Sequence, residues 1–143
     1  SLGQVGDEVV VEVPETLPRV AADPALLERA VANVVGNAVQ ASPPDQPVRV
    51  LAGAVGECVD LRVIDRGPGV APALRDAMFL PFQRLGDQPN GNGVGLGLAV
   101  AHGFLDAMGG SLVAEDTPGG GLTMVLSLPV AGRLSPSSVR TIP

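Results

Sequence analysis

The clearest pattern in the sequence is a helical one, between residues 24 and 41. Apolar side chains recur there every three or four positions, which places them on one face of a helix. Asp23 is a favourable N-cap residue, and Pro24 fits the first helical position because the N–H that it lacks would have no helical partner there. Pro43 and Pro44 cannot continue a helix, so we expect this one to end at about residue 41.

Shorter apolar segments predict strands. These segments are residues 7–13, 20–22, 48–52, 58–64, 111–114 and 122–128. A hairpin loop is predicted at residues 53–56, a short helix at 72–78, and a long helix at about 94–108. The order β-β-α-β-β-α-α-β-β places paired strands between helices, which favours an α/β sandwich with a mixed sheet over a doubly wound parallel sheet.

Composition narrows the class of protein. The chain has 143 residues, of which 45% are hydrophobic and only 2% aromatic, so we expect one domain with a core of Val, Leu and Ala. Residues 1–132 are assigned to that domain, and residues 133–143, where Ser, Pro and Arg dominate, to a disordered tail. A net charge of −6 without a basic cluster argues against a nucleic-acid surface. No apolar run reaches the length of a membrane span, and the absence of lysine excludes a Walker-type phosphate loop.

A glycine-rich stretch is the first candidate for chemistry. Glycines alternate at positions 91, 93, 95 and 97, where the long helix at about 94–108 is predicted to begin. Glycine lets a ligand approach the backbone closely, and the N-terminus of a helix attracts anions through its free N–H groups and its dipole. The stretch therefore indicates a phosphate cradle, although a plain loop would have the same composition.

Two asparagines interrupt the apolar pattern of the first helix. Asn33 and Asn37 are four residues apart and hence on one face, in the middle of a helix where asparagine has no advantage in propensity. One interpretation is a pair that faces solvent. The functional interpretation is a pair of amide oxygens that face a ligand, because such oxygens suit Mg²⁺ that already carries phosphate oxygens and water.

A carboxylate stands at the end of the strand predicted over residues 58–64. Asp65 precedes Gly67-Pro68-Gly69, and one interpretation is an aspartate that only caps this sharp turn. The alternative is a carboxylate at the floor of a pocket, where it would accept a hydrogen bond from an exocyclic amine such as that of adenine. Gly69 would then let the base lie close to the backbone.

Five short motifs resemble, in order, the N, G1, F, G2 and G3 boxes of the catalytic ATP-binding domain of sensor histidine kinases. This domain belongs to a wider superfamily with gyrase, a heat-shock chaperone and the mismatch-repair protein MutL. The motifs are Asn33-Val34-Val35-Gly36-Asn37-Ala38, Asp65-Arg66-Gly67-Pro68-Gly69, Phe79-Leu80-Pro81-Phe82, Gly93-Val94-Gly95-Leu96-Gly97-Leu98 and Gly119-Gly120-Gly121. The match covers roughly residues 5 to 130, and among subfamilies the pattern looks closest to the potassium-sensing KdpD type.

The resemblance implies a fold, two ligands and a first set of roles. The fold would be α+β, the two-layer Bergerat sandwich, with a mixed, mostly antiparallel sheet and about three helices on one face. The ligands would be ATP and Mg²⁺. Asn37 would hold Mg²⁺ and act in catalysis, Asn33 would support the metal or the phosphates, and Asp65 would bond the adenine amine.

The same resemblance assigns roles around the glycine-rich stretch. Arg84 matches a catalytic arginine that reaches the phosphates from the base of a lid, here about residues 83–92 and short for the family. Phe79 and Phe82 would anchor the start of that lid. The other nucleotide-binding positions are Gly67 and Gly69 in the base pocket, Gly93, Gly95, Leu96 and Gly97 at the hinge and helix start, and Thr123 near the adenine.

Two departures from the family pattern bear on function. Hydrolysing members of the superfamily carry a glutamate four residues before the metal-binding asparagine, and here that position is Asn33, whose amide cannot act as a general base. We therefore expect ATP to be bound and oriented without efficient hydrolysis, which argues against an ATPase or an anti-sigma serine kinase. Gln40 stands where histidine kinases commonly have a basic residue, so a degenerate regulatory module that binds nucleotide weakly remains an alternative.

The phosphoacceptor would lie outside this sequence. The one histidine, His102, falls within a predicted helix and lacks the acidic neighbour typical of an acceptor site, so we interpret it as structural. The resemblance then implies two partners: a dimerisation and phosphoacceptor domain of the same protein and, through it, a response regulator. The domain itself would be cytoplasmic and not inserted in the membrane, in a kinase that is membrane-anchored.

Overall fold

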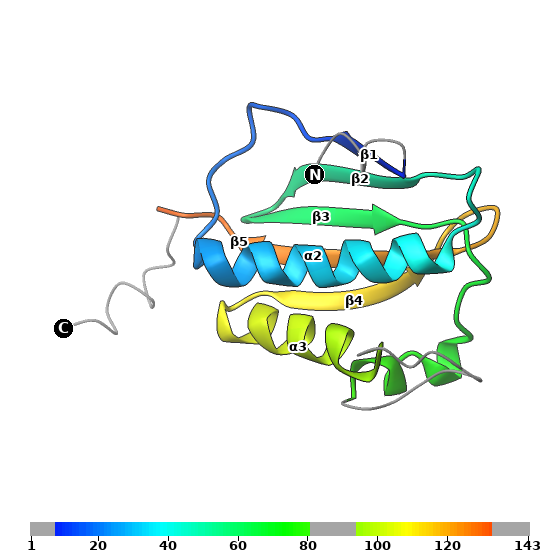
Figure 1. The fold of residues 1–143 in the computed structure, drawn as a ribbon. Helices are drawn as coiled ribbons and strands as arrows, with labels where there is room; N and C mark the ends of the chain where they lie inside the picture. The colour runs from blue at the N-terminus through cyan, green and yellow to red at the C-terminus, as the bar shows by residue number, and fades with distance from the viewer. Residues whose placement is uncertain (1–7, 81–93, 133–143) are drawn as a thin grey trace.

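The computed structural model describes residues 8–80 and 94–132, and its helices and strands carry the labels of Figure 1. Several predictions concern residues outside these two ranges. Those for Phe82, Arg84, Gly93 and the lid over residues 83–92 lie outside the described residues, as does the predicted tail over residues 133–143.

A mixed sheet forms one layer of the molecule (Figure 1). Within the described ranges it has five strands, in the order β1 (Val9–Glu12), β2 (Val48–Val55), β3 (Cys58–Ile64), β5 (Leu122–Pro129) and β4 (Ser111–Asp116). The pair β1–β2 is parallel, whereas β2–β3, β3–β5 and β4–β5 are antiparallel. This confirms the prediction of a mixed, mostly antiparallel sheet in place of a doubly wound parallel one.

The first long helix, α2 (Pro24–Ala41), begins and ends where the sequence predicts. The Asp23 carboxylate accepts hydrogen bonds from the backbone N–H groups of Ala25, at 2.9 Å, and Leu26, at 3.2 Å. These are two of the N–H groups that a helix start leaves without a helical partner. The boundary is therefore fixed by a local contact that the sequence itself specifies.

The second long helix, α3 (Val94–Ala107), ends in a glycine cap. Gly109 has a φ of 78°, and the N–H of Gly110 donates to the carbonyl oxygen of Leu105 at 2.8 Å. This is the left-handed cap that glycine adopts without strain, which explains why two glycines follow the helix. In the part of the chain that the structure describes, no helix combines the length and the apolarity needed to cross a membrane.

Two predictions about shorter elements are wrong in detail. Residues 72–78, predicted as a short helix, form two single 3₁₀ turns, η1 (Pro72–Leu74) and η2 (Ala77–Phe79). So few residues make too few helical hydrogen bonds to offset the cost of nucleation. Residues 20–22, predicted as a strand, contribute only one bridge, between Val20 and Val130.

The hairpin between β2 and β3 turns later than the sequence predicts. The predicted loop was residues 53–56, but β2 continues to Val55, which pairs with Cys58. Gly53 pairs with Asp60 inside the ladder, whereas Gly56, with a φ of 59°, forms the turn. Two glycines three residues apart look equivalent in sequence, and only the second needs a positive φ.

The helices α2 and α3 cover one face of the sheet and enclose the core against it (Figure 1). The largest fully buried side chains are Leu105, Leu126, Val34, Val48 and Val63. The core is thus aliphatic, as the composition predicts. The other face of the sheet is more polar and carries the ion pairs Arg49–Glu12 and Arg62–Glu115.

One end of the molecule gathers segments that are far apart in the sequence (Figure 1). The C-terminus of α2, the C-terminus of β3, the turn between β4 and β5, and the N-terminus of α3 all lie there. The predicted binding motifs fall on these segments. This end of the molecule is therefore the place to look for a site.

Candidate functional site

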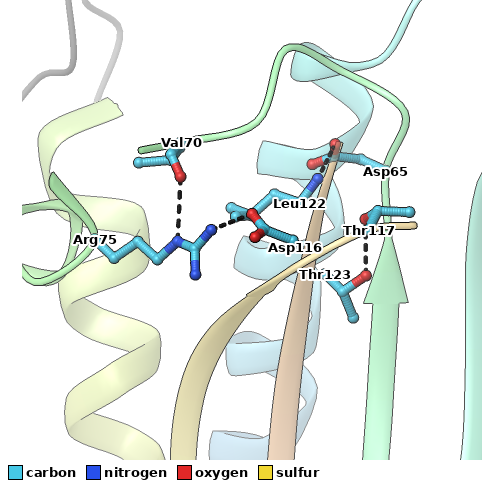
Figure 2. A network of polar contacts seen from close by, with 7 residues as sticks. All are labelled: Asp65, Val70, Arg75, Asp116, Thr117, Leu122 and Thr123. Carbon is cyan, nitrogen blue, oxygen red and sulfur yellow. Dashed lines mark hydrogen bonds and ion pairs between the residues drawn. The ribbon is translucent and has the colours of Figure 1, made fainter. Parts of the chain in front are cut away.

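Asp65 directly follows β3, and its side chain closes this end of the sheet. It is 4% exposed, and its Oδ1 accepts the N–H of Gly67 at 2.9 Å and the N–H of Leu122 at 3.0 Å. Figure 2 shows the bond from Leu122, the first residue of β5. The aspartate therefore does cap the turn. Neither bond uses Oδ2, however, and within residues 8–80 and 94–132 no donor reaches that oxygen, which can accept from a further donor.

The glycines beside Asp65 pack backbone against backbone. A Cβ added at Gly67 would lie 2.4 Å from the carbonyl oxygen of Ala41, and one added at Gly121 would lie 2.1 Å from the carbonyl oxygen of Asp65. Gly69 has a φ of 78°, and its added Cβ would lie 3.3 Å from the carbonyl oxygen of Gly121. The turn after β3 is thus wedged between the end of α2 and the β4–β5 turn, where only glycine fits.

The two asparagines lie in the half of α2 that ends at this turn. Asn33 and Asn37 share one side of the helix, flank its buried stripe and are themselves half-buried. Asn37 stands one turn, about 6 Å along the axis, before the helix end. That end is Ala41, which meets Gly67. The structure therefore brings the predicted metal ligand and the predicted base pocket to the same end of the molecule.

The helix that follows the glycine-rich stretch begins at this end as well (Figure 1). Because α3 starts at Val94, Gly95, Leu96 and Gly97 belong to its first turn. A Cβ added at Gly97 would meet no atom of the described residues within 4 Å. The placement agrees with a helix start near a ligand, while the contact with phosphate stays a prediction.

His102 packs against the 3₁₀ turn η2. Its ring centroid is 5.0 Å from that of Phe79, and its Nδ1 lies 3.5 Å from a carboxylate oxygen of Asp106. This acidic partner comes one helical turn after the histidine and is not adjacent to it in sequence. Because the ring packs against Phe79, the contacts support the interpretation of His102 as structural.

Thr123 has a structural partner of its own. It is 5% exposed, and its hydroxyl oxygen lies 2.8 Å from that of Thr117 (Figure 2). Thr123 pairs with Ile64, and side chains alternate along a strand, so it lies on the face opposite to Leu122 and Met124 in the core. The predicted contact of Thr123 with adenine stays a prediction.

Two arginines hold this end together, and neither was predicted from the sequence to be a site residue. Arg66 donates to the carbonyl oxygen of Pro118 at 2.7 Å. Arg75 donates from Nε to the carbonyl oxygen of Val70 at 3.1 Å and pairs with Asp116 (Figure 2). Pro118 and Asp116 are 52 and 41 residues away from their arginines in sequence. No local pattern signals partners at that separation.

Comparison with known families identifies the family of this chain. The model of the family described as histidine kinase-, DNA gyrase B- and HSP90-like ATPase matches residues 22–132. The chain belongs to this family. The matched residues include the asparagines of α2, the Asp65 turn, α3 and the β4–β5 turn, so the motifs that carried the resemblance all lie within the ATPase family domain.

Curated relatives in this ATPase family are sensor kinases. The sensor protein KdpD of Rathayibacter rathayi is 50% identical over 130 residues, and KdpD of Mycobacterium tuberculosis (strain ATCC 25618 / H37Rv) is 52% identical over 122 residues. These matches cover 91% and 85% of this chain but only 15% and 14% of the relatives. The chain thus resembles one part of KdpD proteins, as the motif pattern predicted.

Solved structures agree with this assignment. The mycobacterial sensor histidine kinase MprB has a TM-score of 0.76 and 31% identity, and the match covers 90% of this chain and 88% of that one. Full-length ShkA in complex with AMPPNP has a TM-score of 0.75 and 32% identity, covering 94% of this chain and 28% of that one. The predicted fold, the α+β sandwich of histidine-kinase catalytic domains, is therefore confirmed.

Proposed function

We propose that this chain binds ATP as the catalytic domain of a two-component sensor histidine kinase and presents the γ-phosphoryl group to a histidine on a separate dimerisation domain. The observation that carries the proposal is the buried Asp65 carboxylate, fixed through Oδ1 and wedged beside Gly67 and the end of α2. Family membership and the identity with KdpD proteins support it. In this proposal the rest of a membrane-anchored protein supplies the acceptor histidine and the contact with a response regulator.

Asp65 would select adenine by its exocyclic amine. Two backbone N–H groups hold Oδ1, so the carboxylate has a fixed orientation before any ligand arrives. An ionised carboxylate only accepts hydrogen bonds, and Oδ2 therefore favours an amine over a keto oxygen. The glycine backbone of residues 67 and 69 would let the base lie against the turn. The site thus suits ATP better than a nucleotide with a keto base.

Asn37 would hold Mg²⁺, with Asn33 supporting the metal or the phosphates. The donor chemistry fits, because Mg²⁺ is usually held by one or two protein oxygens together with phosphate and water. Bound there, the ion would neutralise charge on the phosphates. Arg84 and the start of α3, with Gly93, Gly95, Leu96 and Gly97, would add further phosphate contacts.

The same residues argue against hydrolysis as the main reaction. An amide at Asn33 cannot take a proton from water, so α2 binds and orients the nucleotide without activating a nucleophile. Transfer to an imidazole would then rest on positioning and electrostatic stabilisation. The lack of a general base at this position distinguishes the proposed kinase from an ATPase or an anti-sigma serine kinase.

Replacing Asp65 with asparagine is expected to weaken ATP binding about 30-fold while the domain stays folded. The asparagine oxygen can accept both backbone N–H groups that Oδ1 now accepts, but its NH₂ group would face the adenine amine, donor against donor. Losing such a charge-assisted bond costs about 2 kcal/mol, which corresponds to about 30-fold in Kd. Calorimetric titration of the purified chain with ATP measures the change.

ITP supplies the matched ligand for this variant, because it carries a keto oxygen where ATP carries the amine. Asp65→Asn should lose less affinity for ITP than for ATP, so the preference for ATP should shrink or reverse. An equal loss for both nucleotides would mean that the substitution acts through the fold. An unchanged Kd for ATP would remove Asp65 from the base pocket.

The kinase function itself is tested in the full-length protein, which contains the acceptor histidine in this proposal. Incubation with Mg²⁺ and ATP labelled in the γ-phosphate should place label on the protein as phosphohistidine, which is labile in acid and stable in base. Release of free phosphate should be slow, because Asn33, four residues before Asn37, cannot act as a general base. Steady hydrolysis without a phosphohistidine would refute the kinase proposal and favour an ATPase.

A further inference from the structure

The G1 loop is defined here as residues 65–72. The first residues of this loop are hydrogen-bonded to the start of β5 and to the β4–β5 turn. Asp65 accepts the N–H of Leu122, and Arg66 donates to the carbonyl oxygen of Pro118. Both contacts involve the first two residues of the loop. The second half runs from Gly69, whose φ is 78° and whose backbone approaches Gly121, to Pro72 at the start of η1, and these two bonds do not reach it.

Arg75 holds this second half through a forked contact (Figure 2). It follows η1, and its side chain is only 18% exposed. Its Nε donates to the carbonyl oxygen of Val70 at 3.1 Å, and its Nη2 pairs with the carboxylate of Asp116, the last residue of β4. A guanidinium is planar with its donors in fixed directions, so the two bonds together set the position of Val70 relative to β4.

A pocket of about 330 Å³ lies along this bridge. Residues 68–72 of the G1 loop line one wall, and Asp116, Thr117, Gly120 and Gly121 line the other. The Val70 side chain packs against the core, and the backbone of Gly69 approaches that of Gly121. The Arg75 bridge adds a polar link across the open space, from the carbonyl oxygen of Val70 on one wall to the carboxylate of Asp116 on the other.

We propose that Arg75 is a positioning residue for the nucleotide base. By joining Val70 to Asp116 it keeps the G1 loop in the shape in which Gly69 can lie against the adenine that Asp65 binds, and it does not touch the nucleotide. The inference rests on the proposed function, since it takes ATP as the ligand of Asp65. Without the bridge, binding has to order the second half of the loop, and the entropy lost in that step reduces affinity.

Arg75→Met is the direct test, because methionine keeps an unbranched side chain and removes both bonds. We expect the Kd for ATP to rise about tenfold, by the same factor with and without Mg²⁺, since the base pocket changes and the phosphate contacts do not. Calorimetric titration of the 143-residue chain measures Kd, and thermal unfolding without nucleotide reports on the fold. The matched control is Arg62→Met, which breaks another ion pair to β4, with Glu115, and should leave the Kd unchanged.

Asp116→Asn tests the bridge from its other end. The Asp116 side chain is 77% exposed, so the substitution leaves the fold intact. We expect a rise in Kd of about threefold, because Arg75 keeps its bond to Val70 but loses its ionic partner. Combined with Arg75→Met, the substitution should add no further loss, since both act on the same bridge.

Three results would overturn the inference. Arg75→Met with a lower melting temperature and an unchanged Kd would make Arg75 a stability contact only. Additive losses in the double variant would show that Arg75 does not act through Asp116. Failure of the unsubstituted chain to bind ATP would instead refute the proposed function, and the inference with it, so the two failures are distinguishable.

Discussion

Replacing Gly121 with alanine is expected to lower the free energy of unfolding by about 4 kcal/mol, from backbone strain and overpacking together. Gly121 has a φ of 115°, and the added Cβ would lie 2.1 Å from the carbonyl oxygen of Asp65. A flexible side chain would give way, but backbone on both sides cannot, so the β4–β5 turn has to move away from Asp65. Urea denaturation of the purified chain, followed by circular dichroism, measures the loss.

Gly120→Ala is the matched control. Gly120 has almost the same φ, 116°, but a Cβ added there would meet nothing within 4 Å. Gly120→Ala should lower the free energy of unfolding only by the conformational strain, about 1.5 kcal/mol. The difference between the two variants isolates the close approach to Asp65. Equal losses would show that strain explains both and that the contact of Gly121 with Asp65 contributes nothing.

Elements with a local chemical signature were predictable from the sequence. Asp23 and Pro24 mark the start of α2, and both act only on residues within the first turn. Gly109 marks the end of α3 in the same way, through a backbone conformation that other residues avoid. The strand β3 was predicted at its observed limits from the alternation of apolar and polar residues between Val59 and Val63.

Elements that depend on distant partners were not predictable. Whether Gly53 or Gly56 forms the hairpin turn is decided by the register against β3, which no residue near either glycine encodes. In this case tertiary structure overrides the local pattern. Residues 72–78 form two 3₁₀ turns because so short a segment makes too few helical hydrogen bonds to offset the cost of nucleation, which an apolar pattern alone does not reveal.

The site residues show the same difference between local signals and distant partners. Asn33, Asn37 and Asp65 stood out because each is a polar residue in an apolar context. The structure places Asn37 one helical turn from the end of α2 that meets the Asp65 turn, and Asn33 one turn further away. Arg75 has no such signal, since an arginine in a polar segment gives no hint of a partner 41 residues away. Thr123 was assigned by resemblance, and only the strand register shows that its hydroxyl meets Thr117 on the face away from the core.

Replacing Asn37 with alanine is expected to lower phosphotransfer in the full-length protein about 1000-fold, or roughly 4 kcal/mol of transition-state stabilisation. Asn37 is half-buried on α2 and supplies the proposed oxygen ligand for Mg²⁺. Alanine removes that oxygen and has a higher helix propensity, so α2 should remain folded. The rate of phosphohistidine formation at saturating ATP and Mg²⁺ is the measurement.

Binding data separate a metal role from a general loss of function. Mg²⁺ should tighten ATP binding to the unsubstituted chain, and Asn37→Ala should abolish this effect while the Kd without Mg²⁺ stays the same, because Asp65 is untouched. Asn37→Asp keeps an oxygen ligand and should recover part of the effect. The control is Gly36→Ala on the exposed side of α2, where an added Cβ meets nothing within 4 Å. If Asn37→Ala still transfers phosphate at close to the original rate, the ion is held by other residues and the assignment of Asn37 is wrong.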